Sequence, residues 1–326
     1  MTTTRTYHGG DLQEAESLFG RPPEGWLDLS TGVNPLPYPH TETGNAAWAR
    51  LPQAGPLDAL LSAARRHYGV PARAAIAAGP GSQAILQHLP ALFPSARVAV
   101  LGPTYAEHAK LWTAHGHAVD RVADLAGAGS ADIAVLVNPN NPDGRRISPT
   151  ELIAQSARRR LLVVDEAFAD LDPETSVLPH MADESILSIR SFGKFFGLPG
   201  LRLGFAAGNP EIVAQLADRL GPWAVSGPAL EIGARALEDE DWIAQTRREL
   251  AGRADALDRL LVAAGLQVIG GTALFRLVQD RRAPAIFKRL GAAGIFVRRF
   301  PERPEWLRFG VPGGDTDLRR LKRALG

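Results

Sequence analysis

Short apolar runs that recur between helix-like stretches constrain the fold of this chain more than any other feature. The runs lie between residues 75 and 208, and each is rich in Val, Ile and Leu. They are Arg97–Leu101, Asp132–Val137, Leu161–Val164, Ile186–Ile189 and Leu203–Ala206. Such runs are typical of strands covered on both faces. Because helices separate them, they predict a mainly parallel sheet with crossover connections.

Capping residues and periodicity predict the remaining elements. Ser148 is a candidate N-cap, Pro149 suits the first helical position and Glu151 completes a capping box, so a helix is expected here. After residue 222, Glu231–Leu261 is predicted to be one long amphipathic helical region. Beyond it, a helix is expected near Pro284–Leu290. Strands are expected at Gln267–Ile269, Thr272–Leu277, Ile295–Arg298 and Trp306–Gly310.

These patterns predict two domains. The first 50 or so residues are rich in Gly, Pro and Thr, and are expected to form an irregular arm rather than a packed unit. We expect residues 1–40 to be an arm that contributes to a small domain, and residues 41–225 to be a large domain with a parallel sheet. Residues 226–326 are then expected to form the rest of the small α+β domain.

The composition excludes several classes of function. The 36 Lys and Arg residues nearly balance the 35 Asp and Glu residues, so neither nucleic acid nor a membrane surface is expected as a partner. The chain has no cysteine, which excludes disulfides, thiolate nucleophiles and cysteine-ligated metals. The histidines show no ligand spacing, so no metal site is expected. Met1–Glu16 lacks the apolar core of a signal peptide and no apolar run approaches a membrane span, which predicts a cytoplasmic protein.

Two loops that follow predicted strands carry groups able to bind an anion. In Gly79–Gln83 the glycines allow a close backbone approach, and the amides of Ser82 and Gln83 with the Ser82 hydroxyl could hold a phosphate. The second loop, Asn138–Gly144, is rich in Asn and Pro. Either loop alone is also ordinary turn chemistry. Ligands of open α/β sheets bind beyond the carboxyl ends of the strands, where both loops are expected to lie.

Two charged residues complete the pattern. Asp165 ends a predicted strand, where a carboxylate can keep a pyridine nitrogen protonated, although an acid there is often a helix cap or an ion-pair partner. Lys194 lies among aromatic residues and glycines, and burial there would favour the neutral amine, which can attack an aldehyde. Ser191 and Arg202 in the same segment could add a hydroxyl and a guanidinium to the phosphate site.

In order and spacing, these segments resemble the fold-type-I pyridoxal-5'-phosphate (PLP) enzymes of aminotransferase class I/II, over most of the chain. The Ser-x-x-Lys segment from Ser191 to Lys194, followed by Gly-x-Arg-x-Gly around Arg202, is the most specific part. The resemblance implies an α/β, aspartate-aminotransferase-like fold (PLP fold type I), with a mainly parallel sheet, helices on both faces and a smaller α+β domain. It also implies PLP as the cofactor and a homodimer with active sites at the subunit interface.

The resemblance implies a role for individual residues as well. Lys194 would carry PLP as a Schiff base, Asp165 would pair with the pyridine nitrogen and Tyr105 would stack on the ring. Asn141 would bond the ring oxygen. The phosphate would be surrounded by Gly81, Ser82, Gln83, Ser191 and Arg202.

Segments near both ends of the chain narrow the choice within the family. His8-Gly9-Gly10, Leu27–Pro37 and Pro222–Ser226 are similar to the threonine-phosphate decarboxylases of cobalamin biosynthesis. This similarity implies PLP-dependent decarboxylation of L-threonine O-3-phosphate to (R)-1-amino-2-propanol O-2-phosphate. The substrate would be bound by His8, Asn34, Arg298 and Arg308.

Three alternatives stay open, and two residues depart from the common family pattern. The enzyme alternative is an aminotransferase that acts on a phosphorylated amine such as histidinol phosphate. A non-catalytic PLP-binding or regulatory module is a second alternative, against which the intact Lys194, Asp165 and Arg308 argue. A complex with the enzyme that attaches aminopropanol to cobalamin precursors is a third. Phe168 and Leu51 stand where many members have Tyr, which affects the ring oxygen and the cross-subunit phosphate contact respectively.

Overall fold

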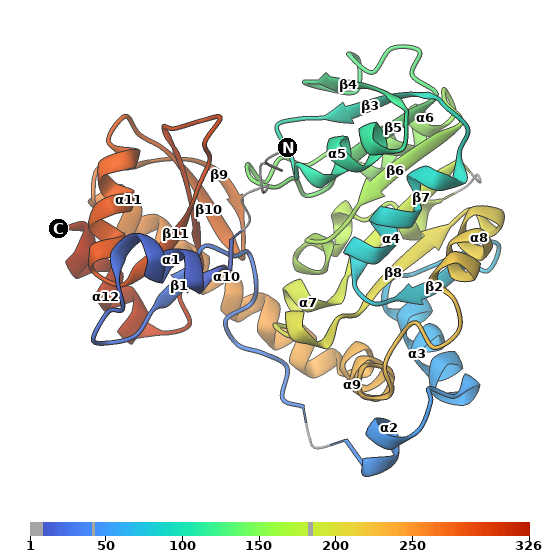
Figure 1. Cartoon of the computed structure of the whole chain (residues 1–326), viewed down its shortest axis with the longest axis horizontal. Helices are drawn as coiled ribbons and strands as arrows, with labels where there is room; N and C mark the ends of the chain where they lie inside the picture. Colours follow the sequence, from blue (N-terminus) through green and yellow to red (C-terminus); the bar gives the residue numbers. More distant parts are fainter. Residues whose placement is uncertain (1–8, 41–42, 182–184) are drawn as a thin grey trace. The chain divides into compact units, whose positions relative to one another are not determined.

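The computed structural model describes residues 9–40, 43–181 and 185–326. Its packing forms two compact units, each described here by itself (Figure 1). Unit 1 takes the residues up to Leu36, then Pro142–Gly144 and Ala244–Gly326, and unit 2 takes Pro37–Asn141 and Arg145–Ile243. The domain boundaries expected at residues 40 and 225 stay a prediction. No helix in the described ranges is both long enough and apolar enough to cross a membrane.

Unit 2 is built on a seven-stranded sheet with the strand order β2-β8-β7-β6-β5-β3-β4. The strands are β2 (Ala75–Gly79), β3 (Arg97–Leu101), β4 (Ala118–Val122), β5 (Ile133–Val137), β6 (Leu161–Asp165), β7 (Ile186–Ser191) and β8 (Gly204–Gly208). The strands from β3 to β7 run parallel, whereas β8 pairs antiparallel with β2 and β7. The predicted mainly parallel sheet is confirmed, and each predicted apolar run forms a strand with small shifts at its ends.

The helices of unit 2 include several that the sequence reasoning did not predict. They are α2 (Asn45–Ala49), α3 (Ala54–His67), α4 (Ser82–His88), α5 (Glu107–Ala114), α6 (Pro149–Ser156), α7 (Phe192–Phe195), α8 (Pro210–Leu220) and α9 (Gly227–Glu238). Short 3-10 turns are η1 (Pro90–Leu92), η2 (Ala169–Leu171), η3 (Pro173–Thr175), η4 (Leu178–His180) and η5 (Pro199–Leu201). The start of α6 is confirmed, because the Ser148 side chain accepts a hydrogen bond from the amide of Glu151.

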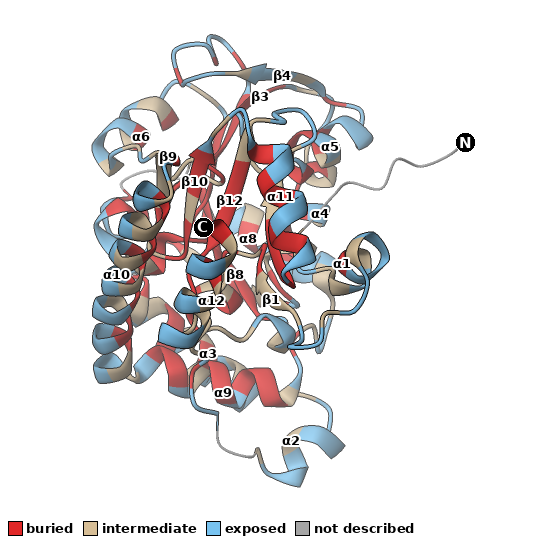
Figure 2. Ribbon diagram, turned by 90° about the vertical axis from the view of Figure 1, so that its left-hand side faces the viewer, coloured by how far each residue is buried: buried red, intermediate tan, exposed pale blue. Residues whose placement is uncertain are grey.

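Alternation along the central strands separates the two faces of this sheet. Val163 of β6 and Ile189 of β7 belong to a core that also contains buried residues of α4, α5 and α8. Successive side chains of a strand point to opposite faces. Val164 and Ser188 therefore point to the other face, on the side away from that core, and both are fully buried. In Figure 2, which is coloured by burial, buried residues are concentrated in the strands inside the fold, whereas exposed residues lie mainly on helices and loops. The same alternation decides which polar residues meet at the strand ends.

Unit 1 contains a five-stranded sheet with the order β1-β11-β12-β10-β9. Its strands are β1 (Leu27–Leu29), β9 (Gln267–Thr272), β10 (Phe275–Gln279), β11 (Ile295–Arg299) and β12 (Trp306–Gly310). Its helices are α1 (Leu12–Phe19), α11 (Ala283–Ala292), α12 (Asp315–Leu325) and most of α10 (Glu240–Ala263). Strand β1 pairs parallel with β11, and the other pairs are antiparallel. One apolar core joins the sheet to its helices.

One prediction about regular structure is wrong, and another holds with an interruption. The described part of the amino-terminal segment is not an irregular arm, since α1 begins at an Asp11 side chain that accepts from the Glu14 amide at 3.1 Å, and β1 joins the sheet of unit 1. The predicted helical region Glu231–Leu261 is confirmed with a break at one residue, because α9 ends before Asp239 and α10 begins after it. The Asp239 side chain accepts from the Trp242 amide at 3.0 Å, which caps a new helix.

Candidate active site

The residues predicted to hold a phosphate meet where α4 begins beside the start of β8. Gly81 has a φ of +86°, and a Cβ atom there would lie 2.5 Å from Nη2 of Arg202. Arg202 is itself left-handed, with a φ of 54°, and its Nη1 donates to the carbonyl of Pro199 at 3.1 Å. A Cβ atom on Gly204 would clash with the backbone nitrogen of Ser82. Glycine at these two positions lets a guanidinium and a helix start approach each other closely.

Hydrogen bonds and one ring contact connect this region to Asp165. The Tyr105 hydroxyl donates to Oε1 of Gln83 at 3.0 Å, and the Tyr105 ring lies edge-on to His108 with centroids 5.9 Å apart. Nε2 of His108 donates to Oδ2 of Asp165 at 3.0 Å, and Oδ1 of Asp165 accepts from the Ala167 amide at 3.1 Å. Both His108 and Asp165 are buried. Asp165 is therefore an oriented carboxylate at the carboxyl end of β6.

His108 is a residue that the sequence reasoning missed. It lies in the first turn of α5, and its amide donates to the carbonyl of Tyr105, three positions earlier, at 3.3 Å. The signal was therefore available once a helix is placed after the Pro103-Thr104-Tyr105 segment. Its partner Asp165 lies 57 residues further along the chain, so the pairing itself is a tertiary event.

The Asn-rich loop after β5 is held by two of its own side chains. Oδ1 of Asn138 accepts from the Ile147 amide at 2.9 Å, and Oδ1 of Asn140 accepts from the Thr104 hydroxyl at 2.7 Å. Both side chains are buried, whereas Asn141 is half-buried. Asn138 and Asn140 thus shape the loop, and the hydrogen bond to Thr104 ties it to the turn that carries Tyr105. The sequence reasoning named only Asn141.

Lys194 lies on the single helical turn α7, directly after β7, and not in an open loop. Its side chain is half-buried, while Phe192, Phe195 and Phe196 around it are buried. The rings of Phe192 and Phe196 stack with centroids 4.3 Å apart. Ser191 is the last residue of β7 and alternates onto the same face as Ile189. Lys194 therefore lies beside packed, buried phenylalanine rings at the carboxyl end of β7, as Asp165 lies at the carboxyl end of β6.

Two of the residues predicted to bind substrate are cross-strand neighbours in unit 1. Arg298 on β11 lies directly opposite Arg308 on β12. Nη2 of Arg308 donates to the carbonyl of Ser30 at 2.8 Å, and its guanidinium lies 4.9 Å from the centre of the Phe275 ring. Like charges directly opposite on paired strands repel each other. This arrangement suits a site where bound anions balance the two guanidinium groups.

The other residues of interest are placed as follows. Asn34 is buried, and its Oδ1 accepts from the Leu36 amide at 2.9 Å. His8 lies outside the described residues. Of the two departures from the family pattern, Phe168 is buried and Leu51 is 62% exposed. Within the described residues, no group of three or more His, Asp or Glu residues could hold a metal ion.

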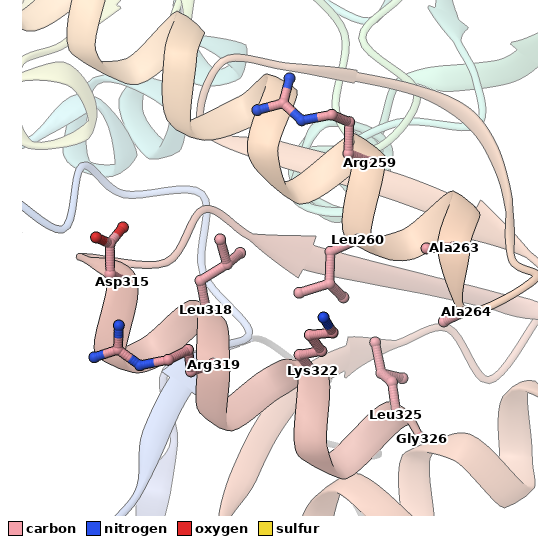
Figure 3. A pocket seen from close by; sticks show the side chains of 10 residues that line it. All are labelled: Arg259, Leu260, Ala263, Ala264, Asp315, Leu318, Arg319, Lys322, Leu325 and Gly326. Atoms are coloured by element: carbon pink, nitrogen blue, oxygen red, sulfur yellow. The ribbon is translucent and has the colours of Figure 1, made fainter.

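Unit 1 also contains a hollow of about 420 Å³ between α10 and α12 (Figure 3). Its lining combines apolar side chains such as Leu260 and Leu318 with charged ones such as Arg319 and Lys322. None of the predicted site residues that the structure describes lines this hollow.

Comparison with known proteins identifies the family. The family model of aminotransferases of class I and II matches residues 45–325. This chain belongs to that family. A threonine-phosphate decarboxylase from Sinorhizobium sp is 47% identical over 326 residues, which cover 98% of this chain and 97% of the relative. Another, from Pseudomonas aeruginosa, is 41% identical over 325 residues and covers 98% and 96%.

Solved structures agree with this class I/II assignment at the level of the fold. A histidinol-phosphate aminotransferase from Sinorhizobium meliloti, solved in complex with pyridoxal-5'-phosphate, has a TM-score of 0.80 and 22% identity to this chain. The superposition covers 96% of this chain and 92% of that one. The predicted aminotransferase fold is confirmed.

The polar groups of unit 2 in this class I/II aminotransferase chain fit PLP. A pyridine nitrogen needs an acceptor, and Asp165 is a buried carboxylate whose direction is set by His108. A phosphate needs hydroxyls and a guanidinium, which Ser82 and Arg202 bring together around a glycine. The aldehyde needs a primary amine, which Lys194 supplies from the same strand ends.

Proposed function

We propose that this chain decarboxylates L-threonine O-3-phosphate to (R)-1-amino-2-propanol O-2-phosphate, a step of cobalamin biosynthesis, with PLP as cofactor. The observation that carries the proposal is the opposed pair Arg298 and Arg308. The substrate has two anionic groups, a carboxylate and a phosphate, and two adjacent guanidinium groups complement them. The relatives at 47% and 41% identity are named threonine-phosphate decarboxylases, which supports the same reaction.

Unit 2 supplies the residues proposed to bind the cofactor. Asp165, oriented by His108, would accept from the pyridine nitrogen, Tyr105 would cover the ring and Asn141 would bond the ring oxygen. Lys194 would bind the aldehyde carbon. The phosphate would be held by Gly81, Ser82, Gln83, Ser191 and Arg202. When bound, PLP supplies an electron sink for the bond that breaks at the substrate's Cα.

The side chains of the protein would then control where protons and charges go. When the carboxylate leaves as carbon dioxide, Cα needs a proton, and the Lys194 ammonium is the donor that we propose. Arg308 would bind the carboxylate and Arg298 the phosphate, so their positions decide which bond at Cα breaks. Asn34, and His8 outside the described residues, stay predicted contacts of the substrate.

The first experiment incubates the PLP-loaded protein with L-threonine O-3-phosphate and measures carbon dioxide and aminopropanol phosphate. A parallel reaction with histidinol phosphate and 2-oxoglutarate measures glutamate, because transamination forms glutamate without release of gas. Release of carbon dioxide, lost in Lys194→Ala together with the visible absorption band of bound PLP, would support the proposal. Glutamate formation without carbon dioxide would replace it with the aminotransferase alternative.

We also propose that two copies of the chain form a homodimer in the cytoplasm. Trp48, Leu51 and Trp223 of unit 2 are 72%, 62% and 59% exposed. They are carried by neighbouring segments, since α2 contacts α9 and Gly227 packs against the carbonyl of Ala47. Large exposed apolar groups that gather in this way are typical of protein interfaces. Light scattering should give the mass of a dimer for the wild type and of a monomer for the variant Trp48→Ser with Trp223→Ser.

A further inference from the structure

A buried network of charged side chains lies behind the cofactor residues, on the opposite face of the sheet. Alternation at the end of β6 directs Asp165 to the face covered by α4 and α5, and the next residue, Glu166, to the other face. At the end of β7 the same alternation directs Ser191 to the face covered by α4 and α5, and Arg190 to the other face. Glu166 and Arg190 meet there, with Nη1 to Oε2 at 3.0 Å.

Glu166 is completely buried and every contact of its carboxylate comes from a protein donor. Oε2 accepts from Ser176 Oγ at 2.9 Å, from Ser188 Oγ at 2.8 Å and from Arg190, while Oε1 accepts from the Val177 amide at 2.6 Å. The Glu166 carboxylate thus accepts three hydrogen bonds at Oε2 and one at Oε1, all from groups of the fold itself.

Arg190 extends the network toward a second acid and a histidine. Its Nη2 donates to Oδ1 of Asp170 at 2.9 Å, and His67 Nε2 donates to the same oxygen at 3.1 Å. The guanidinium also lies 4.2 Å from the centre of the Tyr68 ring. Burial raises the pKa of the Asp170 carboxyl, but the charge of Arg190 and the hydrogen bond from His67 outweigh it and lower that pKa to about 2. The Asp170 carboxylate is therefore ionised at neutral pH.

The network connects the two chain segments that carry the cofactor residues. Glu166 follows Asp165 directly, and its amide also donates to the carbonyl of Ile189 on β7 at 2.8 Å. Arg190 precedes Ser191, the residue that begins the turn with Lys194. The ion pair between Glu166 and Arg190 thus adds a side-chain link to the backbone pairing that joins the ends of β6 and β7.

The far end of the network reaches the same turn from the other side. The ring of His67 lies 6.1 Å from the ring of Phe196, measured between centroids, and Phe196 stacks on Phe192. Lys194 lies between these two phenylalanines in sequence. Both the end of β7 and the phenylalanine rings beside Lys194 are thus in contact with the network.

We propose that Glu166 and Arg190 are positioning residues, which hold the Asp165 carboxylate and the Lys194 amine at the spacing that PLP requires. They touch no reacting atom and act through the backbone of their neighbours. The inference rests on the proposed roles of Asp165 and Lys194 as cofactor residues, and it is independent of which substrate is used.

The test measures cofactor binding in the absence of substrate. In Glu166→Gln the carboxamide keeps the size of the side chain but places an NH₂ group or a neutral oxygen against Arg190. We expect the dissociation constant for PLP to rise about tenfold, because this change corresponds to the free energy of about one charge-assisted hydrogen bond. The pH midpoint of the visible absorption band of bound PLP should move by about half a unit or more, because the amine and carboxylate change their spacing.

Two further variants separate positioning from general stability. Leu152→Ala removes a fully buried side chain of α6 outside the network, so it should lower the melting temperature while PLP affinity and band midpoint stay at the wild-type values. Ser188→Ala removes one donor to Glu166, should fold, and is expected to change both PLP properties in the same direction as Glu166→Gln, by a smaller amount.

The outcomes are distinct. The PLP affinities of Ser188→Ala and, where it folds, of Glu166→Gln are compared with that of Leu152→Ala. If the affinities are the same although all variants lose similar stability, the network is only structural and the inference is wrong. If the wild type shows a normal PLP band but releases no carbon dioxide, the proposed reaction fails, and the positioning result still stands on its own.

Discussion

Asp165 and Glu166 are adjacent acids at the end of one strand, and they differ in how much of their hydrogen-bonding capacity the protein uses. Asp165 accepts from His108 and from one backbone amide, whereas Glu166 accepts from four protein donors. The first is a carboxylate held in a direction, and the second is part of a closed ionic network. The difference shows that a single step along a strand can separate a carboxylate proposed to bind the cofactor from one that belongs to an internal network of the fold.

The largest effect should come from opening the closed network. Arg190→Met leaves Glu166 and Asp170 as buried carboxylates without their cation. We expect the free energy of unfolding in urea to fall by about 3–5 kcal/mol. The matched control is Arg66→Met, because both side chains of its ion pair with Glu238 are exposed and its removal should change the urea midpoint little. Equal, small losses in both variants would show that the network contributes nothing special to the fold.

Asp165→Asn tests the other side of the comparison. The amide cannot keep a pyridine nitrogen protonated by its charge, so the turnover of threonine phosphate should fall by about 100- to 1,000-fold. The urea midpoint should change less than in Arg190→Met, since the asparagine oxygen can still accept from the Ala167 amide and its NH₂ group can donate to Nε2 of the other His108 tautomer. A variant that unfolds much more easily but retains its turnover would place Asp165 with the structural acids.

The arginines of unit 1 belong with Asp165 if the proposed function is right. Arg308→Met and Arg298→Met should each raise the KM for L-threonine O-3-phosphate by about 10- to 100-fold, since each removes charge-assisted hydrogen bonds to an anion. Removal of Arg298 should also relieve the repulsion with Arg308 and leave thermal stability unchanged or slightly higher. An unchanged KM in both variants would contradict their assignment as anion ligands.

The smallest effect should appear at low pH. The pKa of Asp170 is lowered to about 2 in the folded protein, from a usual value of 3.8. Its contribution to stability is therefore fully present above pH 4 and is lost as the pH falls toward 2, an effect on the order of 2 kcal/mol. Unfolding measured between pH 5 and 2 should depend less steeply on pH in Asp170→Asn than in the wild type. If the stability of both proteins falls equally steeply between pH 5 and 2, Asp170 is not a source of that dependence.

Local chemistry accounts for the parts of the fold that were predicted. The apolar runs could be predicted as strands because a short continuous apolar run is itself the signal of a strand buried on both faces. The cap of α6 could be predicted because the amide that Ser148 accepts from is only three residues away. The wrong prediction, that of an irregular amino-terminal arm, concerns contacts of longer range. Strand β1 exists through its pairing with β11, more than 260 positions further along the chain, and its Gly- and Pro-rich surroundings conceal it.

The site divides in the same way. Lys194, Ser191 and Arg202 could be named because they lie within one short motif, and Asp165 because it ends an apolar strand. His108 and Asn140 escaped notice, since their roles depend on partners 57 and 36 positions away. The motif also does not predict which distant residues contact Asp165 or pack around Lys194.

The sequence by itself determined which segments become buried strands, where ligand-binding loops follow them, and which family the motifs resemble, because each of these depends on neighbouring residues. Only the tertiary structure decided that Asp165 meets His108 while Glu166 meets Arg190, and that Asp170 and His67, 103 positions apart, share one hydrogen bond. Alternation along a strand selects the face for each side chain, but the partner on that face is supplied by the packing of distant segments.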